Sequence, residues 1–309
     1  MEFPRRSVSD EDSGLTVTVR GAIGRILRCA VACSASALVA CRDLRPTATL
    51  QLPLDFSRLD QVRSIPGPPW DSVDTPHLRL YTEPGAYAAR HIAALERRAE
   101  RAWTDDLALL HASGYEPRIH IFYFESQARL DSVFGVPGDG QAYPEALLVM
   151  VTANAHGLET PSDRHEMMHV LSITMWGWGA PNERWRHEGL GNLASAPDWP
   201  YTIDQMAAQA RRDGDTRGPA ELSGAGFSAG DSVEKFRAYM LSSSFVGYLI
   251  RANGIDTFRQ LWQQGLPAAP TIYGADIATL TSRWNGYLRT VSLPAGGIDL
   301  AHVQQGASR

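Results

Sequence analysis

The apolar pattern of this 309-residue chain changes near residue 163. Before that point, apolar runs typical of strands are separated by stretches of helical period, and after it every periodic stretch is helical. The pattern predicts an α+β fold with one domain over residues 76–309. Residues 76–162 are expected to form a small mixed β-sheet with helices, and residues 163–309 a mainly helical part.

The expected elements follow from these runs. Apolar or alternating stretches predict strands at 77–82, 118–124 and 145–153. Period, capping residues and terminal glycines predict helices at 86–112, 125–134, 163–177, 182–196, 201–214, 231–254, 255–265 and 277–291. Residues 41–75 include the Pro-rich stretch "SIPGPPWDSVDTP" and are expected to form a flexible tether.

The first 41 residues combine positive charge with a short apolar run. Three arginines in residues 20–28 precede the small apolar segment 29–41, which is too short to span a bilayer. The segment ends in "LVAC", which resembles the bacterial lipobox, whose cysteine is diacylated and becomes the new N-terminus. We therefore expect residues 1–40 to be a removed signal peptide and Cys41 to carry the lipid anchor. A soluble signal peptide or an apolar N-terminal helix is the alternative.

Arg42 follows this cysteine, where Asp would favour retention in the inner membrane. By resemblance to lipoprotein sorting in Gram-negative bacteria, we expect the outer membrane, facing the periplasm. All three cysteines lie at or before Cys41, so neither a disulfide nor a cysteine metal site can form beyond it. The formal net charge is −5 without a basic block, so no nucleic-acid partner is expected.

The stretch "RHEMMHV" holds two histidines and a glutamate at a chemically meaningful spacing. His165 and His169 are four residues apart, so on a helix both imidazoles point to one side and can converge on one ion. Glu166 can then reach a water on that ion, as in the H-E-x-x-H arrangement of zinc proteases. The stretch predicts a zinc site that needs a third ligand.

Glu188 is the candidate third ligand. It lies nineteen residues after His169 on the next expected helix and is followed by Gly189. This spacing resembles the gluzincin pattern, in which the glutamate stands in "P-x-x-W-x-x-E-G-x-A". Here Trp185, Glu188 and Gly189 match, Pro181 stands one residue farther from Trp185 than in the pattern, and Gly191 replaces the common alanine. Glu183 is the alternative ligand, although no glycine follows it.

The region 163–265 also resembles bacterial peptidase-MA-like lipoproteins, through "YMLSSSFVGYLIRANG" at 239–254. The resemblance covers roughly the C-terminal half of the chain. It implies a zincin-like fold and a zinc-dependent hydrolysis of peptide bonds in the cell envelope. Zn²⁺ would have three protein ligands and an open fourth position for water, and Glu166 would act as general base.

Several side chains near these motifs have weaker assignments. The resemblance makes Tyr239 the candidate that stabilises the oxyanion, with Tyr248 and Arg237 in reserve, and Asn192 a candidate partner of a ligand histidine. His187 is one helical step from Glu188, about 100° around the helix, and should not face the same ion. Gly189 would allow close helix packing. Strand 145–153 is expected at the rim of the cleft, pairing with an extended substrate.

Two other functions remain open. A non-catalytic envelope lipoprotein could retain a structural zinc site, or the helical half could be a binding module. A structural site would need a fourth protein ligand and would not require glutamate at position 166. Both points favour a zinc peptidase that acts on peptide or protein substrates.

Overall fold

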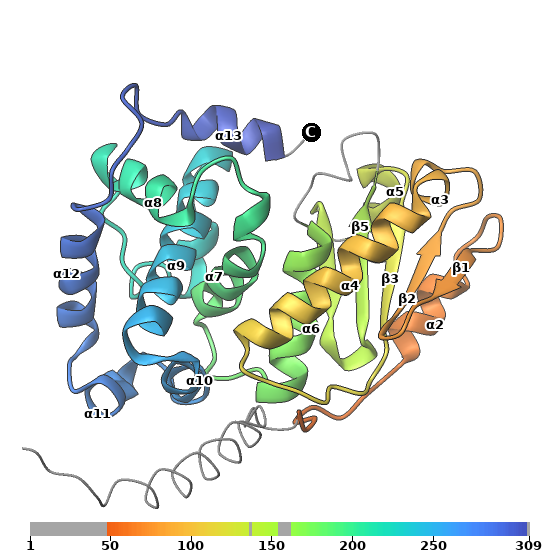
Figure 1. The fold of residues 1–309 in the computed structure, drawn as a ribbon, viewed down its shortest axis with the longest axis horizontal. Helices are drawn as coiled ribbons and strands as arrows, with labels where there is room; N and C mark the ends of the chain where they lie inside the picture. The colour runs from red at the N-terminus through yellow and green to blue at the C-terminus, as the bar shows by residue number, and fades with distance from the viewer. Residues whose placement is uncertain (1–47, 136–137, 154–161, 308–309) are drawn as a thin grey trace, which may run out of the picture. The chain divides into compact units, whose positions relative to one another are not determined.

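The computed structural model describes residues 48–135, 138–153 and 162–307. In this part of the chain, five strands form one mixed sheet in the order β1-β2-β3-β5-β4, beside twelve α-helices (Figure 1). The central strands β2, β3 and β5 are parallel, and β1 and β4 are antiparallel strands at the two edges. The strands are Asp71–Asp74, Leu78–Thr82, Ile119–Phe124, Gly140–Tyr143 and Leu148–Thr152. The expected α+β class with a small mixed sheet is confirmed.

Both faces of the sheet are covered by helices, which explains why its central strands are apolar on both sides. Ile121 and Val149, which pair in the sheet, face the large core beneath α4 (Ile92–Leu109) and α6 (Ser162–Trp176). Phe122 and Met150, the next pair, face a smaller core with α2 (Ser57–Arg63) and α5 (Gln127–Phe134). The alternation follows from the two-residue period of strands.

Helix α6 joins the sheet to the helical part. It contacts β4 and β5 on one side and α7 (Arg184–Ala194) on the other. Helix α7 packs closely on the long helix α9 (Ser232–Asn253), whose Asp231 capping box defines its start. The remaining helices are α8 (Ile203–Arg212), α10 (Ile255–Gln264), α11 (Ala269–Tyr273), α12 (Ile277–Leu288) and α13 (Leu300–Ala307).

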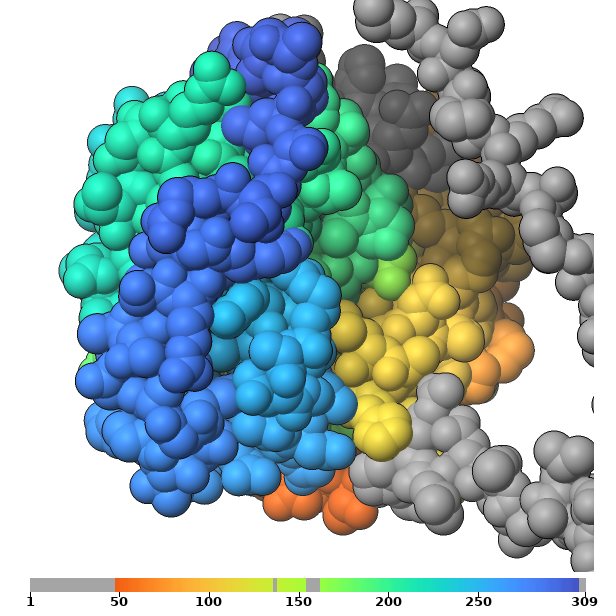
Figure 2. Space-filling model, turned by 60° about the vertical axis from the view of Figure 1, so that its left-hand side comes forward, coloured from red at the N-terminus to blue at the C-terminus, as the bar shows by residue number. Residues whose placement is uncertain are grey.

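The two parts also meet away from α6. Figure 2 shows the pale blue surface of the C-terminal helices beside the yellow surface of α4. A polar contact lies at this boundary, with His111 Nδ1 3.5 Å from Asp256 Oδ2 at the start of α10. It accompanies the shared core, which joins the helical part to the sheet.

Two expectations about the N-terminal part are corrected. The segment 41–75 is not a tether over its described part, because it contains α2 and β1, and Leu59 and Val62 of α2 are buried against the sheet. The single helix expected at 86–112 is two helices, α3 (Tyr87–Arg90) and α4. His91 separates them because its ψ of 15° leaves the helical range and its ring nitrogen lies 2.8 Å from the Tyr87 carbonyl.

The predicted signal peptide, residues 1–40, and the predicted lipidation site, Cys41, lie outside the described residues. Among the described helices, none combines the length and apolar character needed to cross a membrane.

Candidate metal centre

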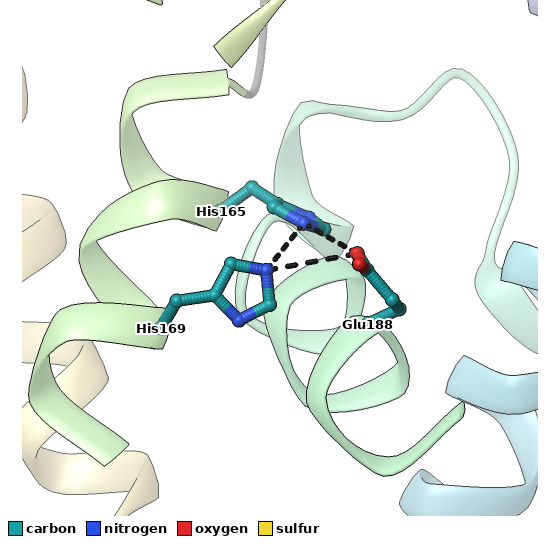
Figure 3. Close-up of side chains that lie close together, drawn as sticks. All are labelled: His165, His169 and Glu188. Atoms are coloured by element: carbon teal, nitrogen blue, oxygen red, sulfur yellow. Dashed lines mark hydrogen bonds and ion pairs between the residues drawn. The ribbon is translucent and has the colours of Figure 1, made fainter. Parts of the chain in front are cut away.

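Three potential ligands meet where α6 crosses α7. His165 and His169 lie on one face of α6, and Glu188 points toward them from α7 (Figure 3). The Nε2 atoms of the two histidines are 3.0 Å apart, and the Glu188 Oε2 atom is 3.1 Å from His165 Nε2 and 3.6 Å from His169 Nε2. The three residues that the sequence predicted as ligands are therefore brought together.

The distances fit a small divalent cation. A tetrahedral ion with ligand distances of about 2.0–2.1 Å separates neighbouring donors by about 3.3 Å. The three separations of 3.0, 3.1 and 3.6 Å scatter around that value. Two imidazole nitrogens and a carboxylate converge here, and in the tautomer with its proton on Nδ1 each imidazole offers a lone pair to the space between them, so this group could hold a metal ion.

Glu188 carries the charge that such a cation needs. Burial by itself raises the pKa of this carboxyl, but contacts with His165 and His169 outweigh burial and hold the pKa well below its usual value. Glu188 is therefore ionised at neutral pH. Its second oxygen, Oε1, accepts a hydrogen bond of 2.8 Å from Arg184 Nε, one helical turn earlier.

Two glycines of α7 let the helices approach closely. A Cβ at Gly191 would lie 2.9 Å from His165 Cε1, so this position leaves space for the imidazole. A Cβ at Gly189 would lie 2.7 Å from Val246 Cγ2 and 2.8 Å from the Ser242 carbonyl oxygen of α9. The expectation that Gly189 permits close helix packing is confirmed, and the contact fixes the side of α7 that carries Glu188.

Glu166 lies next to the ligands on the side of α6 that faces β4. A Cβ at Gly140 would lie 2.8 Å from both Cγ and Oε1 of Glu166, so the carboxylate rests directly on the backbone of this strand. Burial and, to a smaller extent, the nearby charge of Glu188 raise its pKa to about 7, against the opposing effect of His165. A carboxyl with this pKa can both accept and donate a proton near neutral pH.

Arg184 is a site residue that the sequence interpretation missed. Besides its bond to Glu188, it hydrogen-bonds Tyr239, and its guanidinium lies 5.4 Å from the centre of the Phe227 ring. About half of its side chain is exposed, and it lines the cavity in front of the ligands. The signal was present in the sequence, because an arginine four residues before a glutamate on a helix commonly forms an ion pair.

Tyr239 lies on α9 and lines the same cavity. Burial and the charges of Glu188 and Glu166 raise the pKa of its phenol above the usual value, although Arg184 partly opposes them. The hydroxyl therefore stays protonated and can donate a hydrogen bond. Neither reserve residue is placed comparably: Arg237 pairs with Asp213 at 3.2 Å, and Tyr248 packs on Tyr287.

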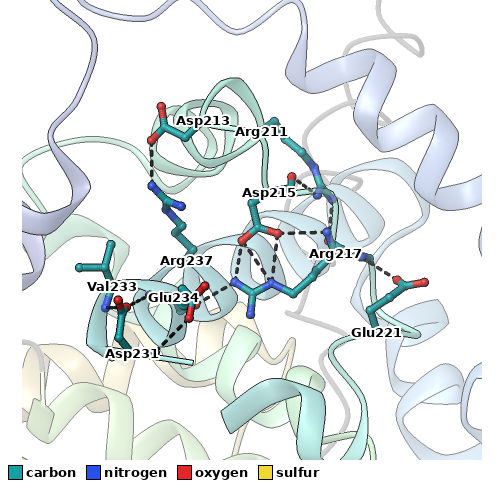
Figure 4. A network of polar contacts seen from close by, with 10 residues as sticks. Arg211, Asp213, Asp215, Arg217, Glu221, Asp231, Val233, Glu234 and Arg237 are labelled. Atoms are coloured by element: carbon teal, nitrogen blue, oxygen red, sulfur yellow. Dashed lines mark hydrogen bonds and ion pairs between the residues drawn. The ribbon is translucent and has the colours of Figure 1, made fainter. Parts of the chain in front are cut away.

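The loop between α8 and α9 supports Arg184 and Tyr239 from behind. Phe227 in this loop packs edge-on against Tyr239, with ring centres 4.9 Å apart. The loop is held by a network of ion pairs and backbone bonds (Figure 4), in which Arg217 binds Asp215 and donates to the Glu234 carbonyl at 2.8 Å. This network anchors the loop to the start of α9, so the wall behind Arg184 is firmly attached.

Other predicted residues have structural contacts. Glu183 is not a ligand, because its Oε1 accepts the Leu266 amide at 2.8 Å and its Oε2 pairs with the buried Arg186. His187 packs on Trp262 and stands outside the ligand group, as its helical position predicts. Asn192 is buried beside the site, but its amide donates to the Glu188 carbonyl at 3.1 Å, where the prediction had it holding a histidine. It steadies α7 below the ligand.

A cavity of about 1060 Å³ opens in front of the three ligands. Its lining includes Glu166, Tyr239 and all four residues of β4. The expected role of strand 145–153 is wrong, because β5 is bonded to β3 on one side and to β4 on the other and has no free edge. Strand β4 was not predicted from the sequence, since four residues with one glycine give no clear period.

No protein-family model matches this chain. No curated protein matches it significantly.

Proposed function

We propose that this protein is a zinc-dependent peptidase of gluzincin type with a zincin-like fold. The observation that carries the proposal is the placement of Glu166 beside the group formed by His165, His169 and Glu188, at the wall of an open cavity. Within the described residues the group has three donors, which leaves a position for water, whereas structural zinc sites usually have four protein ligands.

The side chains have complementary roles in this reaction. When bound, Zn²⁺ supplies a Lewis acid and lowers the pKa of water. Glu166 takes a proton from the attacking water and later passes it to the leaving amine. Tyr239 keeps its proton and donates a hydrogen bond to the developing oxyanion, and Arg184 keeps the Glu188 carboxylate oriented while adding positive charge to the same wall.

An extended substrate would lie along β4. This strand is the last in the order of the sheet and pairs with β5. Its residues line the cavity, and its backbone at Gly140 lies directly beside Glu166. Backbone hydrogen bonds to this strand would bind a peptide without requiring a particular side-chain sequence.

We further propose that the enzyme works in the cell envelope, anchored through a lipid on Cys41 after removal of residues 1–40. The support is the "LVAC" sequence behind an apolar run and three arginines. Such an enzyme would meet peptide or protein substrates in the periplasm.

Metal analysis and peptide cleavage test the proposal together. The protein is purified, its zinc content is measured by mass spectrometry, and hydrolysis of a quenched-fluorescent peptide library is followed. We expect about one zinc per chain, strong loss of zinc in His165→Ala, His169→Ala and Glu188→Ala, and full zinc without turnover in Glu166→Gln. Zinc in the wild type without any hydrolysis would instead indicate a structural site. Full zinc in Glu188→Ala would remove this residue from the ligand set.

A further inference from the structure

Trp178 presents a large apolar side chain to the solvent at the cavity. It is 53% exposed and belongs to the cavity lining. Among the described residues only one other large hydrophobic side chain, Phe56 at 41%, is comparably exposed. A single exposed hydrophobic side chain is common, but this one is an indole in the lining of the cavity that holds the candidate ligands, where it is available to an apolar part of a ligand.

The backbone that carries Trp178 is held in place on both sides. The indole nitrogen of Trp262 donates to the Gly177 carbonyl at 2.9 Å, and the Ala180 amide donates to the Trp262 carbonyl at 3.0 Å. The His187 side chain hydrogen-bonds the Trp178 backbone itself. The exposure of this indole is therefore not the result of a loose segment.

The glycines on either side of Trp178 fix the path of the backbone that carries the indole. Gly177 and Gly179 have φ values of 77° and 70°, in the left-handed region that favours glycine. A Cβ at Gly179 would lie 2.4 Å from the Trp262 carbonyl oxygen, so the segment is pressed against α10. The two glycines commit the chain to this path and leave Trp178 between them facing the cavity.

Trp178 follows the last residue of α6 by two positions and lines the same cavity as the candidate ligands. His165, His169 and Ile173 share one face of this helix at intervals of four residues, and all three line the cavity. From His169 to the last helical residue, Trp176, is about 10 Å along the axis at 1.5 Å per residue. An extended peptide covers that length with about three residues.

We propose that Trp178 forms an apolar subsite of the cavity that binds a bulky aromatic or aliphatic side chain of the substrate near the cleaved bond. The inference deepens the proposed peptidase function by naming a substrate class, and it rests on that function. Stacking on a rigid indole gains contact area without ordering the protein, because the segment is already fixed.

A binding experiment tests the subsite without turnover. Zinc-loaded Glu166→Gln protein is titrated with acetyl-Gly-Gly-Phe-Gly-Gly-amide and with the matched Ala peptide, using calorimetry. We expect the Phe peptide to bind at least tenfold more tightly, Trp178→Ala to abolish this difference, and Trp178→Phe to restore part of it. Phe56→Ala, which removes an exposed aromatic ring outside the cavity lining, should leave the difference unchanged. Zinc content and melting temperature verify that each variant is folded.

The outcomes separate this inference from the proposed function. Equal binding of the two peptides, no binding of the Phe peptide at millimolar concentration, or a preference that persists in Trp178→Ala would overturn the subsite. Selective binding that depends on Trp178, combined with no hydrolysis by the zinc-loaded wild type, would retain the subsite and overturn the peptidase. Hydrolysis that is equally fast for both peptides and insensitive to Trp178→Ala would retain the peptidase and overturn the subsite.

Discussion

The imidazole of His165 lies against Gly191, so closely that a Cβ at this position would be 2.9 Å from Cε1 and 3.0 Å from Nδ1. An alanine here would push the ring away from Glu188 and His169, because the helix backbone behind it cannot yield as easily. We expect Gly191→Ala to weaken zinc affinity by about tenfold or more. Competition with a fluorescent chelator measures the dissociation constant.

Gly286→Ala is the matched control for this change. Gly286 is also a helical glycine, in α12, but a Cβ there would meet nothing closer than 3.7 Å. The zinc affinity of the Gly286→Ala protein should equal that of the wild type, and the alanine should stabilise α12 slightly. If Gly191→Ala binds zinc as tightly as Gly286→Ala, the close contact does not control the ligand.

Gly140 has a corresponding relationship with Glu166. A Cβ at position 140 would be 2.8 Å from the Glu166 carboxylate, which would have to leave its place on β4. Because Glu166 is not a ligand in the proposed reaction, we expect Gly140→Ala to keep its zinc but to lower kcat by about ten- to a hundredfold. Steady-state kinetics, with Gly296→Ala as a control at an open position, measures the effect. An unchanged kcat would show that Glu166 tolerates displacement.

Arg184 is expected to position Glu188. Removing its guanidinium takes away the 2.8 Å bond to Glu188 Oε1 and leaves the carboxylate freer to rotate. We expect Arg184→Ala to lower zinc affinity by about tenfold to a hundredfold, and Arg184→Lys to recover part of the loss. Arg237→Ala is the control, since Arg237 pairs with Asp213 and is not part of the cavity lining. Loss of zinc in the control to the same extent would indicate a general disturbance.

Tyr239→Phe separates the oxyanion role from packing. The ring keeps its contact with Phe227, while the hydroxyl donor near Arg184 is lost. We expect zinc content, melting temperature and KM to stay near the wild type, and kcat to fall about a hundredfold, as for one oxyanion donor. If the folded, zinc-loaded variant has the kcat of the wild type, Tyr239 contributes only to packing of the core.

His120 should make the fold less stable in acid. Burial, and next the charges of Arg63 and Arg79, lower its pKa to about 4, below the unfolded value near 6.5. Its Nδ1 lies 3.0 Å from the Tyr81 hydroxyl, which donates to this nitrogen when the ring is neutral. Between these two pKa values the unfolded state binds the proton more readily than the folded state. The contribution of His120 to the free energy of unfolding is therefore fully present above pH 6.5 and is lost as the pH falls toward 4.

Urea unfolding of the metal-free protein at several pH values measures this effect. We expect the wild type to lose about 1–2 kcal/mol between pH 7 and pH 4.5 through His120, an amount reduced from the full shift because the ring is partly exposed. His120→Asn keeps an acceptor near the Nδ1 position and should flatten the curve in this range. Parallel curves for the two proteins would contradict the assignment.

The convergence of the three potential metal ligands could be predicted from the sequence because it depends on spacing along helices. His165 and His169 need one helix, and Glu188 needs a second helix beside the first, as the structure has them. The part of the cavity wall formed by Tyr239 and Arg184 could not be predicted in this way. Tyr239 follows Glu188 by 51 residues, and its approach to Arg184 depends on how α9 packs on α7.

The fold was predictable where elements are long and periodic and not where they are short. The strands β2, β3 and β5 lie within one or two residues of the expected runs, apart from the turn at 144–146, because they are buried on both faces. The edge strands β1 and β4 have four residues each, and their partners, not their own side chains, make them strands. Local pattern carries no information about such pairing.

Ten of the fifteen residues of α6 are buried, between the sheet and α7. The rotation of this helix about its own axis is therefore set by apolar contacts, and one residue more or less in its packing register would turn the imidazoles by about 100°. A chain could keep the letters H-E-x-x-H and still direct them away from any third ligand. For recognising metal sites among distant sequences, the apolar residues between and after the histidines thus carry as much information as the histidines themselves.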